Sequence, residues 1–418
     1  MFSTLQRTTC FSIILSSILL SSLFANATEI AAKDYPFPTK NAYVASVFSA
    51  FATPKVKPHV WAVQYRSDRK EIKVLDRDLI IKLAAFQQSK TAPLVLVIAG
   101  VGGDGNSGVA VALAEQFHKK GYNVIALPGT VSWMYSVAIS ETAAPGYNPR
   151  DKIEYYTWIK WVLNYAKKQG MKFNDISLVG YSYGGLLTGF LAPYDLTQSQ
   201  PLFKKVIMIN PAMDPEFGLK KLDSLYDQGE NIAESRKVSI RVATYEAALS
   251  TPPTADPVEA VFKFMKQQQI GLKEIQWVIG DSFRFSLQNI VLGTQYVIDR
   301  GVLKSTYSKF SLNKRYEESK TINFSQYMDK IVMSSLTPEE RAKDTNYESS
   351  FYSQLENLKN DSRVFIFENT DDFIVKPSDI DLLRQNFSER LFLFPYGGHL
   401  GNALAPSHVE LYLNVLAQ

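Results

Sequence analysis

The stretch Gly180-Tyr-Ser-Tyr-Gly-Gly185 decides the fold that this sequence predicts. The apolar run Ile176-Ser-Leu-Val179 precedes it, and Leu186-Leu-Thr-Gly-Phe-Leu191 follows as the start of an apolar helix. Glycines two positions before and after Ser182 permit a sharp strand-to-helix turn, where larger side chains would crowd. The pattern predicts that Ser182 is presented at the end of a strand, beside a helix N-terminus.

A serine in such a turn can act as a nucleophile. Its hydroxyl is weak on its own, so a base and aimed backbone N–H donors must stand beside it. The alternative is a glycine-rich turn with a solvent-exposed serine that has no role. The strand before the six residues and the helix after them favour the nucleophile.

Strands and helices alternate around this turn. Apolar runs predict strands at 94–99, 123–127, 175–179 and 205–209, with helices that end near 117 and span 151–168. Strands that are apolar throughout and separated by helices indicate a mostly parallel sheet covered on both faces. Earlier in the chain, His59–Tyr65 and Glu71–Leu75 predict an opening pair of strands.

The alternation stops after Asn210, and the pattern up to Asp361 is mostly helical. Strands resume at 363–368 and 390–394, and a helix over 408–416 ends the chain. We expect the insertion to form a helical cap over the carboxyl edge of the sheet, where ligands bind in open α/β sheets. The predicted segments are a signal peptide (1–27), a lead segment with one helix (28–58), a core (59–211 and 362–418) and a cap (212–361).

The base for Ser182 must come from four histidines. His59 lies in the first strand region, His118 near a helix end and His408 at the start of the last helix. His399 instead lies in a glycine-flanked loop just after the final strand, from which a side chain can reach a serine at the top of the sheet. The sequence therefore favours His399 over a turn histidine without a role.

The third group must be a carboxylate that orients the imidazole. The loop after the penultimate strand supplies Asp371 and Asp372, and adjacent carboxylates point in different directions, so only one can serve. Asp214, in the loop after 205–209, is a further candidate. From the residues alone the choice stays open.

Taken together, these features resemble the α/β-hydrolase superfamily, over about 93–209 and from 363 to the end. Serine, acid and histidine follow one another in the superfamily's order. Its members commonly carry the acid three residues before a valine near a proline, as Asp372 stands before Val375. The resemblance thus implies a catalytic triad of Ser182, Asp372 and His399.

The resemblance also implies an oxyanion hole. One donor would be the backbone N–H of Tyr183, and the other that of Val101 or Gly102 in the glycine loop after the first core strand. Ala99 departs from the common pattern, because many members carry a histidine before that loop. The loop keeps its expected role, while the choice of its donor stays open.

Composition and spacing exclude several other classes. Hydrophobic residues make up 46% and charged residues 21%, as in a well-cored globular protein. A net charge of +4 without basic runs gives no support for nucleic-acid binding. The loop Gly100-Val-Gly-Gly-Asp-Gly105 lacks the P-loop lysine and does not match Gly-x-Gly-x-x-Gly, and no paired His or Cys spacing predicts a metal. We therefore expect no cofactor and no metal.

The first residues predict export. Arg7 precedes the apolar run Phe11–Phe24, and Ala25-Asn-Ala27 is a small-x-small cleavage pattern. The run is shorter than the roughly 20 residues that span a bilayer, which disfavours an uncleaved anchor. Cleavage would also remove Cys10, the single cysteine, and a cysteine-free exported protein fits a bacterial periplasmic or secreted one.

The sequence is interpreted as an exported serine hydrolase that cleaves an ester or other acyl bond through an acyl-enzyme. A small-molecule or lipid-like acyl substrate is favoured by the aromatic cap residues Trp277, Phe283, Phe285 and Tyr296, although such residues commonly form a cap's own core. A serine peptidase or an acyltransferase would use the same triad. A non-catalytic exported binding protein of this fold is the alternative from another class. Nothing in the pattern indicates membrane contact.

Overall fold

The structure, a computed structural model, describes residues 27–51, 54–66, 68–69, 71–72, 77–106, 108–252 and 256–418. The predicted signal peptide, with Arg7, Cys10 and its apolar run, lies outside the described residues except for Ala27. Among the helices that are described, none is both long and apolar enough to cross a membrane.

The centre of the described chain is a nine-stranded sheet in the order β1-β11-β10-β9-β8-β6-β7-β5-β2. Neighbours from β1 to β7 are parallel, and the last two strands are antiparallel to their neighbours. In this order the bounds are Thr28–Glu29, Leu391–Phe394, Val364–Asn369, Phe203–Ile209, Phe173–Tyr181, Ala92–Ile98, Asn123–Leu127, Ile81–Phe86 and His59–Val63. The predicted mostly parallel sheet is confirmed.

The opening pair of strands is the part of the sheet that the sequence analysis paired wrongly. β2 pairs with β5, Trp61 opposite Leu83, while Glu71–Ile72 (β3) pairs only with Arg77–Asp78 (β4) in a separate small sheet. A two-residue strand has little surface to bury. β5 (Ile81–Phe86) is buried at every position but one, and so lacks the polar alternation by which a half-exposed strand is recognised.

Helices cover both faces of the sheet. Alternate residues of a strand point to opposite faces, and Leu96 of β6 accordingly joins a cluster with Phe190, whereas Val97 joins one with Phe117. The body helices are α3 (Gly108–Lys119), α4 (Trp133–Ala138), α5 (Asn148–Lys168), α6 (Tyr183–Leu196), α16 (Pro377–Phe387) and α17 (Pro406–Ala417). Apolar burial on both faces explains why the core strands lack polar alternation.

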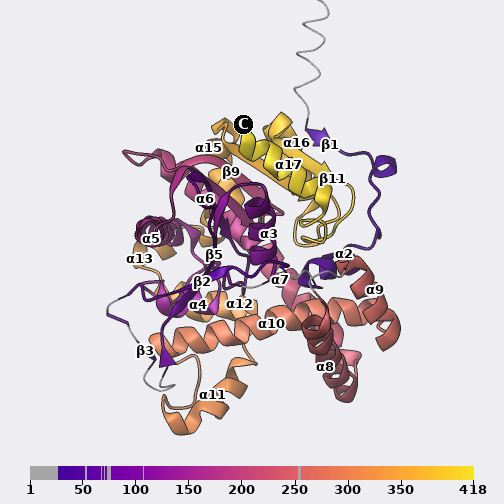
Figure 1. Cartoon of the computed structure of the whole chain (residues 1–418). Coiled ribbons are helices and arrows are strands. Elements are labelled where there is room, and N and C mark those ends of the chain that lie inside the picture. Colours follow the sequence, from indigo (N-terminus) through magenta and orange to yellow (C-terminus); the bar gives the residue numbers. More distant parts are fainter. Residues whose placement is uncertain are drawn as a thin grey trace, which may run out of the picture.

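A helical region stands between β9 and β10. In Figure 1 the long α10 runs beneath the body, with α8 and α11 on its far side. An added Cβ at Gly280 of α10 would clash with the backbone of α7, so the two helices cross in close contact. The helices are α7 (Pro215–Asp227), α8 (Glu234–Ser250), α9 (Pro257–Gln268), α10 (Leu272–Val297), α11 (Leu312–Ser319), α12 (Phe324–Tyr327), α13 (Pro338–Arg341), α14 (Thr345–Glu348) and α15 (Leu355–Asn360). We call residues 215–360 the cap.

The lead segment contributes α2 (Ala42–Val47), continued by a short 3-10 helix over Phe48–Phe51. Its helical pattern was predicted from the spacing of its apolar residues. The Asn41 side chain caps the helix by accepting hydrogen bonds from two backbone N–H groups. This helix lies against the loop that carries His399, with consequences for the site.

Candidate active site

Ser182 lies at the turn between β8 and α6 with φ 57° and ψ −128°, a conformation that is unusual for a residue other than glycine. The flanking glycines explain how the turn is accommodated. A Cβ at Gly180 would clash with Thr188 and Gly184, and one at Gly184 would clash with the backbone of β6. The glycine pattern is therefore a steric requirement of this turn.

Ser182, His399 and Asp372 form one hydrogen-bonded chain. The Ser182 Oγ lies 2.9 Å from His399 Nε2, and His399 Nδ1 lies 2.8 Å from Asp372 Oδ2. The other carboxylate oxygen of Asp372 accepts the Ile374 N–H at 3.0 Å. With Nδ1 donating to Asp372, Nε2 is free to accept the serine proton. All three side chains are buried.

The rival acids have other partners. Asp371 accepts hydrogen bonds from the backbone N–H groups of Gly397 and Gly398, and burial raises its pKa to about 6. Asp214 accepts the N–H of Phe217 as the N-cap of α7. Each therefore supports a loop or a helix end, and the structure places only Asp372 within hydrogen-bonding distance of His399.

The other three histidines lie elsewhere. His59 is exposed on β2, and the Nδ1 of His118 lies 3.0 Å from the side-chain nitrogen of Gln88. His408 packs in the body with its Nε2 at 3.2 Å from the Tyr35 hydroxyl, and burial lowers its pKa to about 3. None of them makes a hydrogen bond with Ser182 in the described part of the chain.

Two backbone N–H groups near Ser182 are candidates for the predicted oxyanion hole. Tyr183 is the first residue of α6, so its N–H has no acceptor within the helix. Gly102 donates its N–H to the carbonyl of Val131 at 2.7 Å, which removes it as the second donor. The N–H of Val101 makes no hydrogen bond to another described residue, and Val101 lines the cavity beside Ser182. Of the two predicted loop donors, the geometry leaves Val101.

The loop of His399 rests on the lead helix, a support that the sequence analysis missed. The backbone N–H of His399 donates to the Ser46 Oγ of α2 at 2.7 Å. Gly398 has φ +54°, and a Cβ there would clash with the backbone of Ala42. The paired glycines before His399 were visible in the sequence, but their neighbour, some 350 residues away, was not.

Asn210 and Glu368 complete the polar surroundings of Asp372, and the sequence analysis missed both. Asn210 directly follows β9 with φ +43°, and its side-chain N–H groups donate to Asp372 at 3.2 Å and to Glu368 at 2.6 Å. Glu368 is fully buried in β10. Both were visible in the sequence as polar residues that end apolar strands.

The cavity beside Ser182 is small and apolar. Its volume is about 20 Å³, enough for about one water molecule. The cap contributes Pro215, Gly218, Leu219, Leu222 and Phe283 to its wall. Apart from Ser182 and His399, the remaining lining residues are Val101, Tyr183, Ala212 and Ile374.

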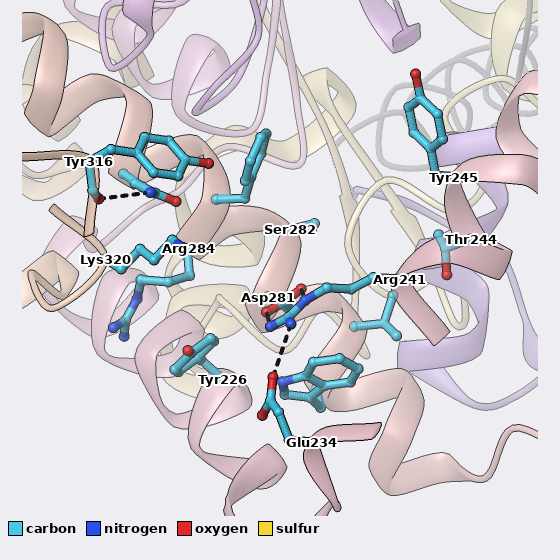
Figure 2. A pocket seen from close by; sticks show the side chains of 14 residues that line it. Tyr226, Glu234, Arg241, Thr244, Tyr245, Asp281, Ser282, Arg284, Tyr316 and Lys320 are labelled. Atoms are coloured by element: carbon cyan, nitrogen blue, oxygen red, sulfur yellow. Dashed lines mark hydrogen bonds and ion pairs between the residues drawn. The ribbon is translucent and has the colours of Figure 1, made fainter. Parts of the chain in front are cut away.

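A second cavity, of about 750 Å³, lies within the cap and is lined by neither Ser182 nor His399 (Figure 2). Its arginines already have partners: Arg241 pairs with Asp281 and stacks over Trp277, and Arg284 stacks over Tyr226. The four aromatic residues that favoured a lipid-like substrate do not line one common cavity. Trp277 and Phe285 line this cavity, Phe283 lines the one beside Ser182, and Tyr296 is buried within the cap.

Among the described residues, no group of three or more His, Cys, Asp or Glu side chains is placed to hold a metal ion. The loop after β6 packs closely against Ser182, since a Cβ at Gly100 would lie 2.9 Å from the Cβ of Ser182. The glycines of this loop thus allow close approach to the serine.

Comparison with known proteins gives matches among solved structures. No family model matches the chain, and no curated protein matches it by sequence. Est1E from Butyrivibrio proteoclasticus is 13% identical, with 86% of this chain and 99% of that chain covered at a TM-score of 0.36. A hydrolase from Oleispira antarctica is 14% identical, with 86% and 100% covered at 0.41. An acylaminoacyl peptidase from Pyrococcus horikoshii is 10% identical, with 87% and 42% covered at 0.42.

The assignment of the fold rests on the chain's own architecture. A mostly parallel sheet is covered on both faces, and a serine turn follows β8. The acid loop follows β10, the histidine loop follows β11, and helices are inserted between β9 and β10. The resemblance seen in the sequence is confirmed at this level, and the chain has the α/β-hydrolase fold.

Proposed function

We propose that the protein is a serine hydrolase that cleaves an ester of an apolar acyl group through an acyl-enzyme on Ser182. The observation that carries this proposal is the chain of two hydrogen bonds from the Ser182 hydroxyl through His399 to Asp372, at 2.9 and 2.8 Å. A hydroxyl, an imidazole and a buried carboxylate in this order form the arrangement that activates a serine.

In the first half of the reaction, Ser182 Oγ attacks the ester carbonyl carbon while His399 Nε2 takes the hydroxyl proton. The N–H groups of Tyr183 and Val101 stabilise the negative charge that forms on the carbonyl oxygen. Asp372 holds the imidazole in place and stabilises its protonated form. The carbon–oxygen bond to the leaving group then breaks, and His399 gives its proton to the departing alcohol.

In the second half, water takes the place of the alcohol. His399 removes a proton from the water as it attacks the acyl carbon. The bond to Ser182 breaks, the serine regains its proton from His399, and the carboxylic acid leaves. An acyltransferase would differ only in using an alcohol in place of water at this step.

The walls of the cavity support an apolar acyl group. The cap side chains Leu219, Leu222 and Phe283 line the cavity beside Ser182, and none of the residues that line this cavity is a lysine, arginine, aspartate or glutamate. A peptidase that recognises a charged chain terminus needs a paired charge near the scissile bond, because an unpaired buried charge is costly. An uncharged ester fits these walls better.

Substrate entry requires the cap to move. A cavity of about 20 Å³ cannot hold an ester, since ligand pockets are typically about 300 to 1,000 Å³. The residues that fill the space come from α7 and α10. Displacement of these two helices would open the site, and their return would exclude water during acylation.

Export through the N-terminal signal remains part of the proposal, with cleavage after Ala27. Mass spectrometry of the protein from a bacterial periplasm or culture medium tests it. A mature N-terminus at Thr28 is expected. An intact N-terminus on protein recovered from the cytoplasm would contradict export.

The test of the activity uses a fluorescent fluorophosphonate, which labels activated serines. Wild-type protein is expected to be labelled, and Ser182→Ala is expected to lose the label. Ser286→Ala is the matched control, because it removes a nearby serine of α10 that lies against Gly102 in the glycine loop after β6. Folded wild-type protein that takes no label would refute a hydrolase and favour a binding protein.

Hydrolysis of p-nitrophenyl esters of increasing acyl length then tests the substrate class. Release of p-nitrophenol with acid as the product identifies a hydrolase, and transfer of the acyl group to an added alcohol in preference to water identifies an acyltransferase. Equal rates on short and long chains would contradict apolar acyl recognition.

A further inference from the structure

Glu368 is a buried acid beside the proposed triad that the reaction scheme does not use. It precedes the last residue of β10 and has no exposed surface. Its Oε1 accepts two hydrogen bonds, from the Asn210 side chain at 2.6 Å and from the Asn369 backbone at 2.8 Å. No described residue donates a hydrogen bond to its Oε2.

The neighbour of Glu368 is the carboxylate of Asp372. Asn210 bridges the two acids, because its amide nitrogen donates to Glu368 Oε1 and to Asp372 Oδ2. No lysine or arginine in the described part of the chain forms an ion pair with Glu368. The charged or titratable groups around the pair are thus Asp372 itself, His399 on its far side and Asp371 in the same loop.

Two adjacent buried carboxyl groups cannot both ionise without a large cost, so one of them keeps its proton. Asp372 has the better environment for a negative charge, since it receives N–H groups from His399, Asn210 and Ile374. Burial and the negative charge of Asp372 raise the pKa of Glu368 well above its usual value.

We propose that Glu368 is a positioning residue that keeps its proton at working pH and donates it as a hydrogen bond to Asp372, which fixes that carboxylate toward His399. This role of Glu368 rests on the proposed function, because Glu368 would act on the reaction only through Asp372 and His399. A neutral Glu368 leaves Asp372 as the ionised member of the pair, next to the imidazole that it stabilises when His399 is protonated. On this proposal the hydrogen-bonded chain runs from Ser182 through His399 and Asp372 to Glu368.

Two variants separate a neutral donor from an ionised acid. Glu368→Gln keeps the shape, the neutrality and an N–H donor, and we expect its kcat to stay within about threefold of wild type, with the same pH profile. Glu368→Leu removes the donor. We expect it to lower kcat by about 10- to 100-fold with little change in KM, and to shift the acidic limb of the pH profile, since Asp372 then holds His399 differently.

Infrared difference spectroscopy of wild type against Glu368→Gln reads the protonation directly, even where Glu368→Leu fails to fold. A protonated carboxylic C=O band in wild type at neutral pH, absent from Glu368→Gln, supports the proposal. Absence of that band overturns it. So does a Glu368→Gln variant that fails to fold or loses as much kcat as Glu368→Leu, or a Glu368→Leu variant with wild-type kcat and pH profile.

The two proposals fail separately. Wild-type protein that neither takes the fluorophosphonate label nor cleaves esters would refute the hydrolase, while the infrared band would still report on Glu368. Wild-type protein that is active but lacks the band would refute only the role of Glu368.

Discussion

The carboxyl edge of the sheet and the cap meet at Ser182 and are built in different ways. On the sheet side Asp372 alone accepts hydrogen bonds from His399, Asn210 and Ile374. On the cap side the contacts with the same cavity are apolar, from Leu219, Leu222 and Phe283. Directional bonds fix atoms in place, whereas apolar contacts tolerate changes of shape. The sheet edge is therefore suited to the chemistry and the cap to the choice of substrate.

The contact region between the body and the cap, which we call the seam, differs from both because it is polar and buried. Asn148 donates its side-chain N–H to the Ser349 carbonyl at 2.8 Å, and the Tyr327 hydroxyl donates to the Pro145 carbonyl at 2.7 Å. Beneath these bonds Asp151 is fully buried, with one oxygen accepting the Gly146 N–H at 2.7 Å and the other without a hydrogen-bond partner in the described chain. Changes in the three regions should have different effects.

The largest effect is expected on the sheet side, where two neighbouring acids have different partners. Asp372→Asn should lower kcat by about 10⁴-fold, because an amide in this place favours the wrong imidazole tautomer. Asp371→Asn keeps an oxygen for one of its two backbone donors, the Gly398 N–H, and should cost less than tenfold. Steady-state kinetics on one p-nitrophenyl ester measures both. The opposite ranking would refute the assignment of the acid.

The seam should show the next largest effect, on stability. Burial raises the pKa of Asp151 to about 7, so the folded protein keeps this proton where the unfolded chain has lost it. Between about pH 4 and pH 7 this group therefore reduces the free energy of unfolding as pH rises. Asp151→Asn removes that dependence, and three pK units correspond to about 4 kcal/mol.

Urea unfolding of both proteins at pH 5 and pH 8 measures this difference. At each pH we compare the free energy of unfolding of Asp151→Asn with that of wild type. We expect this difference to favour the variant more at pH 8 than at pH 5. An identical difference at the two pH values would show that Asp151 is already ionised at pH 5 or still protonated at pH 8.

A cap substitution should change selection more than chemistry. Phe283→Ala enlarges the cavity beside Ser182, so the ratio of kcat/KM for a long-chain over a short-chain ester should rise about fivefold or more. Phe285→Ala is the matched control, because Phe285 is 57% exposed and lines the second cavity instead. An equal change of this ratio in both variants would mean that Phe283 does not contact the acyl chain.

An effect much smaller than that of Asp372→Asn is expected where the lead helix supports the loop that carries His399. Ser46→Ala removes the acceptor of the His399 N–H, a loss of about 1 kcal/mol, and should lower kcat about threefold to tenfold with KM unchanged. Ser49→Ala, whose hydroxyl bonds to the Ser46 carbonyl instead, serves as the control and should leave kcat unchanged. An unaltered kcat in Ser46→Ala would show that the loop holds its shape without α2.

Local chemistry explains how far the sequence predicted this molecule. The strand before Ser182, the glycines around it and the helix after it are contiguous, so steric rules reveal the turn without knowledge of the rest. Asp371 and Asp372 are adjacent in sequence, and only the resemblance to a known superfamily separated them. Their different partners depend on loops that meet in space.

The missed features are contacts that no single segment of the sequence reveals. β5 pairs with β2 and β7 although its apolar residues do not alternate as in a half-exposed strand. Glu368 lies beside Asp372 because the chain bends after β10. Asn210 lies beside Asp372 because of the register between β9 and β10. Propensity and periodicity describe a segment, whereas such contacts depend on the packing of the whole sheet.

The hydrogen bond between His399 and Ser46 joins positions 353 residues apart, nearly the ends of the described chain. Closing so long a loop is entropically costly and slow compared with forming a helix. We therefore expect the hydrogen bond from His399 to Ser46 to form late in folding, when α2 docks on the loop that follows β11. If the proposed activity depends on this contact, activity should return later on refolding than the secondary structure does.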